Sequence, residues 1–219
     1  MIRNLKNDKS IFLISLALSF VYILPFIINN NYVVDDWLRT DTGVTAWEGN
    51  GRPLSSVIMA AISMFGGGLN FFGDGVLYDI FPLTIILCAF VMTFCGYLIS
   101  AELGMKSPIA KAACMLLPLT STLFIGNIYF RFDSLIMSLS CLGAILQARM
   151  SAERGIVCWI SSVVIGFISI SIYQASIPFV LSYLALMCFM RYFNENKNDV
   201  INLIIKVFSS LFFSFLIYK

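Results

Sequence analysis

Long apolar runs are the feature of this sequence that most limits what it can fold into. The 219 residues are 59% hydrophobic and 12% charged, whereas soluble domains carry about 25% charged residues. So few polar side chains cannot cover a water-facing surface, and helices of about 20 apolar residues can cross the hydrocarbon core of a bilayer. The sequence therefore predicts an all-α polytopic membrane protein, with residues 1–219 forming a single membrane domain.

We expect about six or seven membrane-spanning helices. The first apolar run, Ile11 to Ile28, follows a basic segment and precedes no small-residue cleavage site, so we interpret it as a span and not as a signal peptide. The last predicted span is interrupted by the end of the chain at Lys219. The spans after the first are expected near residues 76–100, 109–126, 134–148, 156–173, 177–193 and 204–218.

The longest segment between predicted spans covers residues 29–75. Within it, residues 53–65 are apolar but too few to cross a bilayer. Pro53 suits the first turn of a helix, and three glycines at 66–68 are expected to end it as a flexible joint. This pattern predicts an interfacial or re-entrant helix in the first outer loop.

The basic residues predict the orientation. With a cytoplasmic N-terminus, ten Lys and Arg side chains fall in short inner loops and three in outer loops, as the positive-inside rule requires. The net charge of +2 gives no indication of nucleic-acid binding. The inner residues are Arg3, Lys6, Lys9, Lys106, Lys111, Arg149, Arg154, Arg191, Lys197 and Lys206, and the outer ones are Arg39, Arg52 and Arg131.

In this topology, polar residues from four distant segments fall on the outer side, which a shared pocket there would explain. These residues could also have simpler roles. Carboxylates in loops are usually only solvated, and aromatic side chains such as Trp37 are common at the membrane–water interface. Arg131 and Asp133 could also form an ordinary ion pair. The candidate site residues are Asp35, Asp36, Arg39, Trp47, Arg52, Arg131, Asp133, Tyr173 and Gln174.

Group transfer onto a hydroxyl at the membrane surface requires residues of these types. A carboxylate can act as general base, and an arginine can hold the phosphate of a lipid-linked donor. No glycine-rich nucleotide-binding loop occurs, which favours a lipid-linked donor over a nucleotide sugar. The chain lacks histidine and its six cysteines lack CxxC spacing, so zinc is not expected. We expect no cofactor, although an acidic pair can also ligate Mg²⁺ or Mn²⁺.

Four motifs carry a resemblance to known proteins. Val34-Asp35-Asp36-Trp37-Leu38-Arg39 is similar to the acidic motif in the first outer loop of GT-C class membrane glycosyltransferases. With Gly51-Arg52-Pro53-Leu54, residues 129–134 and Tyr173-Gln174-Ala175-Ser176, it resembles the bacterial and phage O-antigen glucosyltransferases of the glucosyl transferase GtrII type. The resemblance extends over roughly residues 10–190.

The resemblance implies a bacterial inner-membrane enzyme that moves glucose from undecaprenyl-phosphate-glucose to lipopolysaccharide O-antigen at the periplasmic face. Asp35 and Asp36 match the acidic motif, and the division of roles between them stays open. Arg52 and Arg131 match positions that would hold the phosphate. Asp133 and Gln174 would line the pocket with Arg39, Trp47 and Tyr173.

Such enzymes are about twice as long, so we expect this chain to be a fragment or truncated product, with its activity alone left open. Two alternatives remain from the sequence: a transporter or flippase for a lipid-linked sugar, and an inactive membrane remnant. Transport would require polar residues near the middle of the spans, and few are present.

Overall fold

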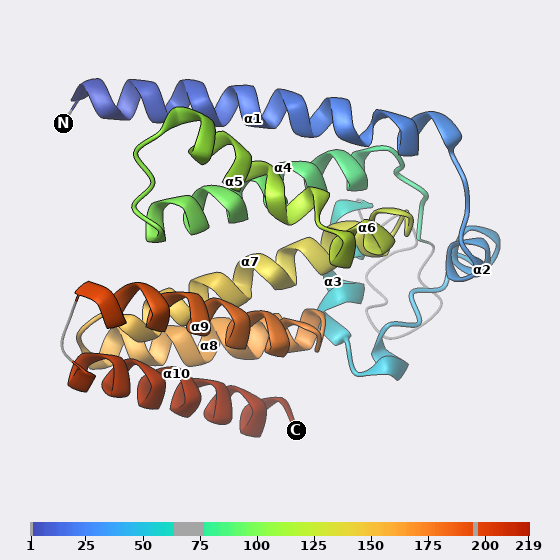
Figure 1. The fold of residues 1–219 in the computed structure, drawn as a ribbon. Coiled ribbons are helices and arrows are strands. Elements are labelled where there is room, and N and C mark those ends of the chain that lie inside the picture. Colours follow the sequence, from blue (N-terminus) through green and yellow to red (C-terminus); the bar gives the residue numbers. More distant parts are fainter. Residues whose placement is uncertain (1, 64–76, 195–196) are drawn as a thin grey trace. The chain divides into compact units, whose positions relative to one another are not determined.

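The structure is a computed structural model that describes residues 2–63, 77–194 and 197–219. Within these ranges it contains helices and no strand, which confirms the all-α prediction for the part described (Figure 1). In chain order the elements are α1 Ile2–Asn29, α2 Val34–Thr42, the 3₁₀ turn η1 Glu48–Asn50, α3 Pro53–Ile62, α4 Leu83–Glu102, α5 Pro108–Thr120, α6 Thr122–Ile128, α7 Asp133–Ala152, α8 Ile156–Ile172, α9 Ser176–Asn194 and α10 Lys197–Tyr218.

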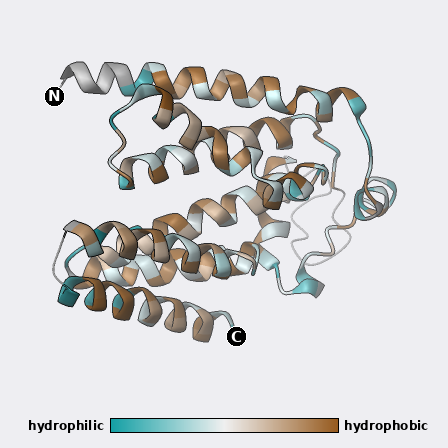
Figure 2. Cartoon of the chain, viewed as in Figure 1, coloured by the Kyte–Doolittle hydropathy of each residue, from teal (hydrophilic) through white to brown (hydrophobic). Residues whose placement is uncertain are grey.

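Five of the described helices are long and apolar enough to cross a membrane: α1, α4, α7, α9 and α10. Figure 2 shows hydrophobic residues along most of their length. Large apolar side chains such as Leu13 and Phe212 are exposed, at 53% and 60%, which suits a surface in contact with lipid. The chain thus has the composition and helix lengths of a multi-pass membrane protein, and its exact number of spans stays a prediction.

Several predicted spans differ from the structure. The span predicted at 76–100 is α4, which begins seven residues later, at Leu83. The span predicted at 109–126 is two helices, α5 and α6, bent by 55°, because extended backbone at Ser121 interrupts the helical hydrogen bonds. Helix α8 has 17 residues, or about 25 Å, which is short of a bilayer core of about 30 Å. Helix α10 begins seven residues before the predicted start at 204 and reaches 22 residues.

Helix α3 forms inside the first predicted outer loop and begins at Pro53, as expected. It ends at Ile62, three residues before the predicted end. The predicted glycine joint at 66–68 lies outside the described residues. A position of α3 at the membrane interface stays a prediction.

Contacts divide the chain into two compact units. Unit 1 comprises Met1–Ala46 and Ser56–Ser138, and unit 2 comprises Trp47–Ser55 and Leu139–Lys219. The boundary therefore passes through α3 and α7. The expectation of one membrane domain over 1–219 stays a prediction.

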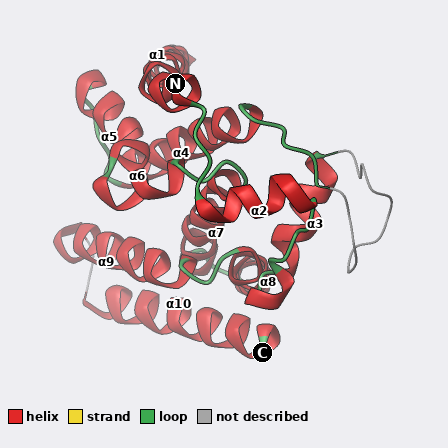
Figure 3. Ribbon diagram, turned by 90° about the vertical axis from the view of Figure 1, so that its right-hand side faces the viewer, coloured by secondary structure: helices red, strands yellow, loops and turns green. Residues whose placement is uncertain are grey.

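The core of unit 1 consists of α1, α4 and α5, which contact one another (Figure 3). Gly96 of α4 permits close packing, since a Cβ there would lie 2.5 Å from the Cα of Met115 on α5. The Ser19 and Thr93 hydroxyls share a buried hydrogen bond of 2.7 Å between α1 and α4. Asp8, near the start of α1, pairs with Lys111 of α5. Helix α1 then leads to α2 and the polar cluster described below.

Unit 2 joins α7, α8 and α10 through small and polar residues. Hydroxyl contacts of 2.7 and 2.8 Å link Ser151 to Ser162 and to Ser210. Ser214 of α10 donates to the Val163 carbonyl of α8 at 2.9 Å. Interhelical hydrogen bonds of this kind are common in membrane proteins, where apolar surfaces gain little by leaving lipid.

Candidate active site

Asp36 lies at the centre of a buried polar cluster in unit 1. Its side chain is fully buried in the first turn of α2. The carboxylate Oδ2 accepts hydrogen bonds from the backbone N–H of Val33 at 3.3 Å and of Arg131 at 3.1 Å. The first bond caps α2, and the second ties α2 to the turn before α7. Asp36 thus joins two segments that are 95 residues apart in sequence.

Burial raises the pKa of Asp36 above its ordinary value, because a charged carboxylate loses its hydration. The backbone N–H groups that face it lower the pKa and partly offset this effect, while the nearby Asp133 carboxylate raises it. The second oxygen, Oδ1, is buried without a hydrogen-bond partner among the described residues. The carboxylate is therefore held by one oxygen and destabilised in its ionised form.

Arg131 is enclosed by groups from two other segments, residues 30–32 and residues 79–81. Its Nη1 lies 3.1 Å from Oδ2 of Asp79, and its Nη2 donates to Oδ1 of Asn30 at 2.6 Å. The rings of Tyr32 and Phe81 lie 4.1 and 4.0 Å from its guanidinium carbon. The Tyr32 hydroxyl also donates to Asp79 at 3.2 Å. Only 6% of Arg131 is exposed, so these contacts fix its guanidinium group.

A second buried ion pair connects α2 with the start of α7. Arg39 Nη1 donates to Oδ2 of Asp133 at 2.9 Å, with both side chains almost fully buried. Arg131 pairs with Asp79 instead, so the direct pair between Arg131 and Asp133 considered from the sequence is replaced by two longer-range pairs. The result is a fixed arrangement of α2, the segment before α4 and the turn before α7.

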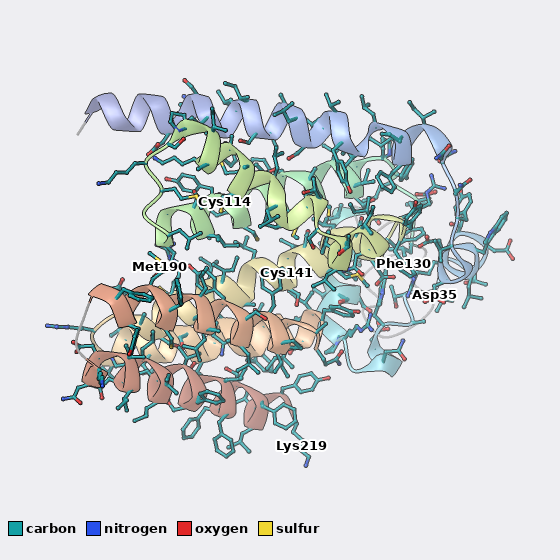
Figure 4. The ribbon with its side chains drawn as sticks, viewed as in Figure 1. Asp35, Cys114, Phe130, Cys141, Met190 and Lys219 are labelled. Atoms are coloured by element: carbon teal, nitrogen blue, oxygen red, sulfur yellow. The ribbon has the colours of Figure 1, made fainter. Side chains whose placement is uncertain are left out.

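The two carboxylates of the acidic motif occupy different environments. Asp35, which is labelled in Figure 4, is exposed on the first turn of α2. Its neighbour Asp36 is buried. Trp37, also exposed, packs its ring 5.0 Å from that of Tyr32. Asp35 therefore lies on the surface of the protein, while Asp36 is enclosed within unit 1.

A small cavity lies beside Arg131. Its other lining residues are three aromatic side chains, two amides and one aliphatic residue: Phe26, Phe81, Tyr129, Asn29, Asn31 and Ile128. Aromatic faces and amide groups are suited to pack against a sugar ring and to hydrogen-bond its hydroxyls.

The remaining predicted residues gather in unit 2. Gln174 Nε2 donates to the Gly51 carbonyl at 3.0 Å and to the Tyr218 hydroxyl at 2.8 Å, and that hydroxyl donates to Gly51 at 2.6 Å. The Arg52 guanidinium lies 4.3 Å from the centre of the Tyr173 ring. Trp47 is fully buried, and its carbonyl accepts the Arg52 N–H at 3.0 Å. The buried indole of Trp47 favours a packing role.

The nine predicted residues thus form two groups. Asp35, Asp36, Arg39, Arg131 and Asp133 come together in unit 1, and Trp47, Arg52, Tyr173 and Gln174 in unit 2. One pocket shared by both groups stays a prediction.

Sequence reasoning missed Asp79, Asn30 and Tyr218. Asp79 fell inside the predicted span 76–100. A carboxylate within a membrane span requires a polar partner, so the sequence already indicated that Asp79 would be paired.

A metal-binding cluster of three or more His, Cys, Asp or Glu side chains does not occur among the residues that the structure describes. The expectation that the chain needs no metal stays a prediction.

Comparison with known proteins identifies the family. The family model described as Glucosyl transferase GtrII matches residues 24–219. The chain belongs to the GtrII glucosyl transferase family. It is also 29% identical over 171 residues to a protein of Salmonella phage P22 named "Uncharacterized 55.3 kDa protein in gtrB 5'region". That match covers 78% of this chain and 33% of the phage protein, so the chain corresponds to about a third of that relative. No solved structure matches the chain.

Membership of the GtrII family confirms the resemblance found in the sequence. The matched region contains both polar groups, from Asp35 in α2 to Gln174 before α9. The family name indicates a glycosyltransferase, and its candidate active site in this chain is the unit 1 cluster around Asp36.

Proposed function

We propose that the chain is the catalytic membrane part of a glucosyltransferase acting at the periplasmic face of the bacterial inner membrane. Its donor would be a polyprenyl-phosphate-linked glucose, such as undecaprenyl-phosphate-glucose, and its acceptor the O-antigen of lipopolysaccharide. Family membership supports the sugar transfer, and the five apolar helices support a membrane setting. The observation that carries the proposal is the pair formed by exposed Asp35 and buried Asp36 within the family match.

In this proposal Asp35 is the general base. It takes the proton from an acceptor hydroxyl, whose oxygen then bonds to the anomeric carbon of the donor. The bond between that carbon and the phosphate oxygen breaks, and polyprenyl phosphate leaves with the electron pair. Asp35 suits this role because it is exposed on the first turn of α2, where an acceptor sugar can reach it.

Asp36 is a positioning residue in the same proposal. One of its oxygens already accepts two backbone hydrogen bonds, from Val33 and Arg131. Those bonds fix the first turn of α2, and therefore the place of Asp35, relative to the turn before α7. A buried acceptor that holds this turn in one geometry reduces the reorganisation needed for reaction.

The surface around Arg131 is the proposed contact for the donor. The cavity there, about 20 Å³ in volume, is too small to enclose a glucosyl ring, so in this proposal its aromatic and amide residues contact the donor from outside, and the guanidinium supplies positive charge near the departing phosphate. Arg52, stacked on Tyr173 in unit 2, is the second candidate for phosphate binding. No cofactor takes part in the proposed reaction.

The test is a mass measurement of O-antigen repeats in bacteria with smooth lipopolysaccharide that also make the polyprenyl-linked donor. The chain, and separately any longer in-frame product of its gene, is expressed in these cells. The proposal predicts a gain of one hexose per repeat. An unchanged repeat mass with both proteins, each shown to be inserted in the membrane, would contradict it. Transfer of labelled donor across proteoliposomes without transfer to acceptor would instead indicate a transporter.

A further inference from the structure

A polar cavity lies at the other end of α8 from Tyr173 and Gln174. It has a volume of about 570 Å³ and is lined within unit 2 by residues of the α7–α8 turn, the end of α9 and the start of α10. Figure 1 shows that these three parts of the chain lie at the same end of unit 2. Its polar lining residues are Glu153, Arg154, Arg191, Asp199, Asn202 and Lys206. In a chain with 12% charged residues, five charged side chains around one cavity form an unusual concentration.

Among the described residues that line this cavity, three cations face two carboxylates, which leaves one positive charge in excess. The cations come from three elements: Arg154 from the α7–α8 turn, Arg191 from α9 and Lys206 from α10. Lys206 is oriented by one hydrogen bond of 3.2 Å from its Nζ to the Glu153 carbonyl. Arg191 and Lys206 are half-buried, so their charges lie partly inside the protein surface.

We infer that this cavity binds a phosphate group, and specifically the phosphodiester of a membrane phospholipid headgroup. A phosphodiester carries one negative charge and accepts the paired hydrogen bonds that arginine provides. Basic cavities between membrane helices on the cytoplasmic side bind phospholipid headgroups in this way. The excess of one positive charge fits an anionic lipid such as phosphatidylglycerol better than zwitterionic phosphatidylethanolamine. This site is separate from the proposed active site and does not depend on it.

The experiment measures lipid retention by native mass spectrometry of the purified protein in detergent, with phosphatidylglycerol or phosphatidylethanolamine added. Arg191→Gln and Lys206→Gln should each weaken phosphatidylglycerol binding about fivefold, since a basic residue near a lipid surface contributes roughly that factor. Lys197→Gln is the matched control, because this exposed residue of α10 does not line the cavity. Its binding should equal that of the wild type.

Competition with soluble glycerol phosphate tests whether the cavity binds a membrane lipid headgroup or any phosphate ester in solution. Weak binding of this ester beside tight binding of the lipid would support the proposal. Equal displacement of the lipid by the soluble ester would overturn the assignment to a membrane lipid. Equal lipid retention by the wild type and both cavity variants would overturn the site itself. Thermal unfolding of each variant verifies that the fold is retained.

Discussion

The two units hold their buried polar groups in different ways. Unit 1 contains two ion pairs in its polar cluster, Arg39–Asp133 and Arg131–Asp79, around the carboxylate of Asp36. Unit 2 joins its helices with serine hydroxyls and with the amide of Gln147. Buried ion pairs add little net stability over apolar packing, yet loss of one partner is costly. The comparison indicates that unit 1 uses buried charge to fix the geometry of the acidic motif, whereas unit 2 uses neutral contacts to pack its helices.

Breaking a buried ion pair of unit 1 should give the largest effect. Arg39→Ala leaves the Asp133 carboxylate buried without its 2.9 Å partner, which should lower the free energy of unfolding by about 3–5 kcal/mol. Lys111→Ala is the control, since its pair with Asp8 is partly exposed and should contribute less than about 1 kcal/mol. Denaturant unfolding in detergent measures both. Equal losses would refute a special role for the buried pair.

The backbone turn at Gly51 in unit 2 provides the next largest effect. Gly51 has a φ of +71°, and an added Cβ would lie 2.5 Å from the Tyr218 hydroxyl. Gly51→Ala should therefore lower the free energy of unfolding by about 1–2 kcal/mol through its backbone conformation alone. Displacement of the Tyr218 hydroxyl should lower it further.

Gly104→Ala is its matched control, because Gly104 has a φ of +58° and open space around its Cβ position. The same unfolding assay should show a greater loss for Gly51→Ala. If Gly104→Ala lowers the free energy of unfolding as much as Gly51→Ala does, the close approach of Tyr218 to Gly51 adds nothing to the loss.

Neutral contacts of unit 2 should be individually weak. Ser210→Ala removes the 2.8 Å hydrogen bond with Ser151. It should lower the free energy of unfolding by about 0.6 kcal/mol, the typical value for interhelical hydrogen bonds in membrane proteins. Ser182→Ala, an exposed serine bonded only within α9 in the described contacts, should change the free energy of unfolding still less. A loss above about 2 kcal/mol at Ser210 would mean that the serine network is as critical as the ion pairs of unit 1.

The pH dependence of stability should report the burial of Asp36. Its raised pKa means that the folded state binds a proton more tightly than the unfolded state. Stability contributed by this group is present below the unfolded pKa and falls as pH rises to the folded pKa. Asp36→Asn keeps an oxygen for the two N–H donors without the charge, so it should remove this fall and be neutral or stabilising at pH 7.

Asp41→Asn, an exposed position on the same helix, should leave the pH profile of the free energy of unfolding unchanged. An unaltered profile for Asp36→Asn as well would show that burial does not raise the Asp36 pKa.

Much of the fold could be predicted because bilayer thickness sets the length of an apolar helix. The run that became α9 was located to within one residue at both ends, and the ends of α1 and α4 to within two residues. The starts were less accurate, because α1 begins nine residues before the predicted start and α4 seven residues after it. The break at Ser121 could not be located, since apolar residues continue on both sides of it. The true extent of α10 was missed because its first turns contain polar residues such as Asn198 and Asp199.

The candidate site could be predicted in part. Four polar motifs were found, but their pairing depends on which helix face each residue occupies. Adjacent residues of a helix differ by about 100°, so one turn of α2 exposes Asp35 and buries Asp36. Asp79 pairs with a residue 52 positions later in the chain, Arg131, and no local pattern indicates such a partner.

In the proposed mechanism, Asp35 takes the proton from the acceptor and Asp36 holds Asp35 in place. The most direct measurement is the rate of hexose transfer to O-antigen by membranes containing Asp35→Asn, Asp36→Asn or the control Asp41→Asn at equal protein level. We expect Asp35→Asn to lower the rate at least 100-fold, since general bases contribute factors of roughly 10²–10⁴. We expect a small loss for Asp36→Asn, whose amide oxygen keeps both hydrogen bonds, and none for Asp41→Asn. Full activity of Asp35→Asn together with an inactive Asp36→Asn would contradict this mechanism.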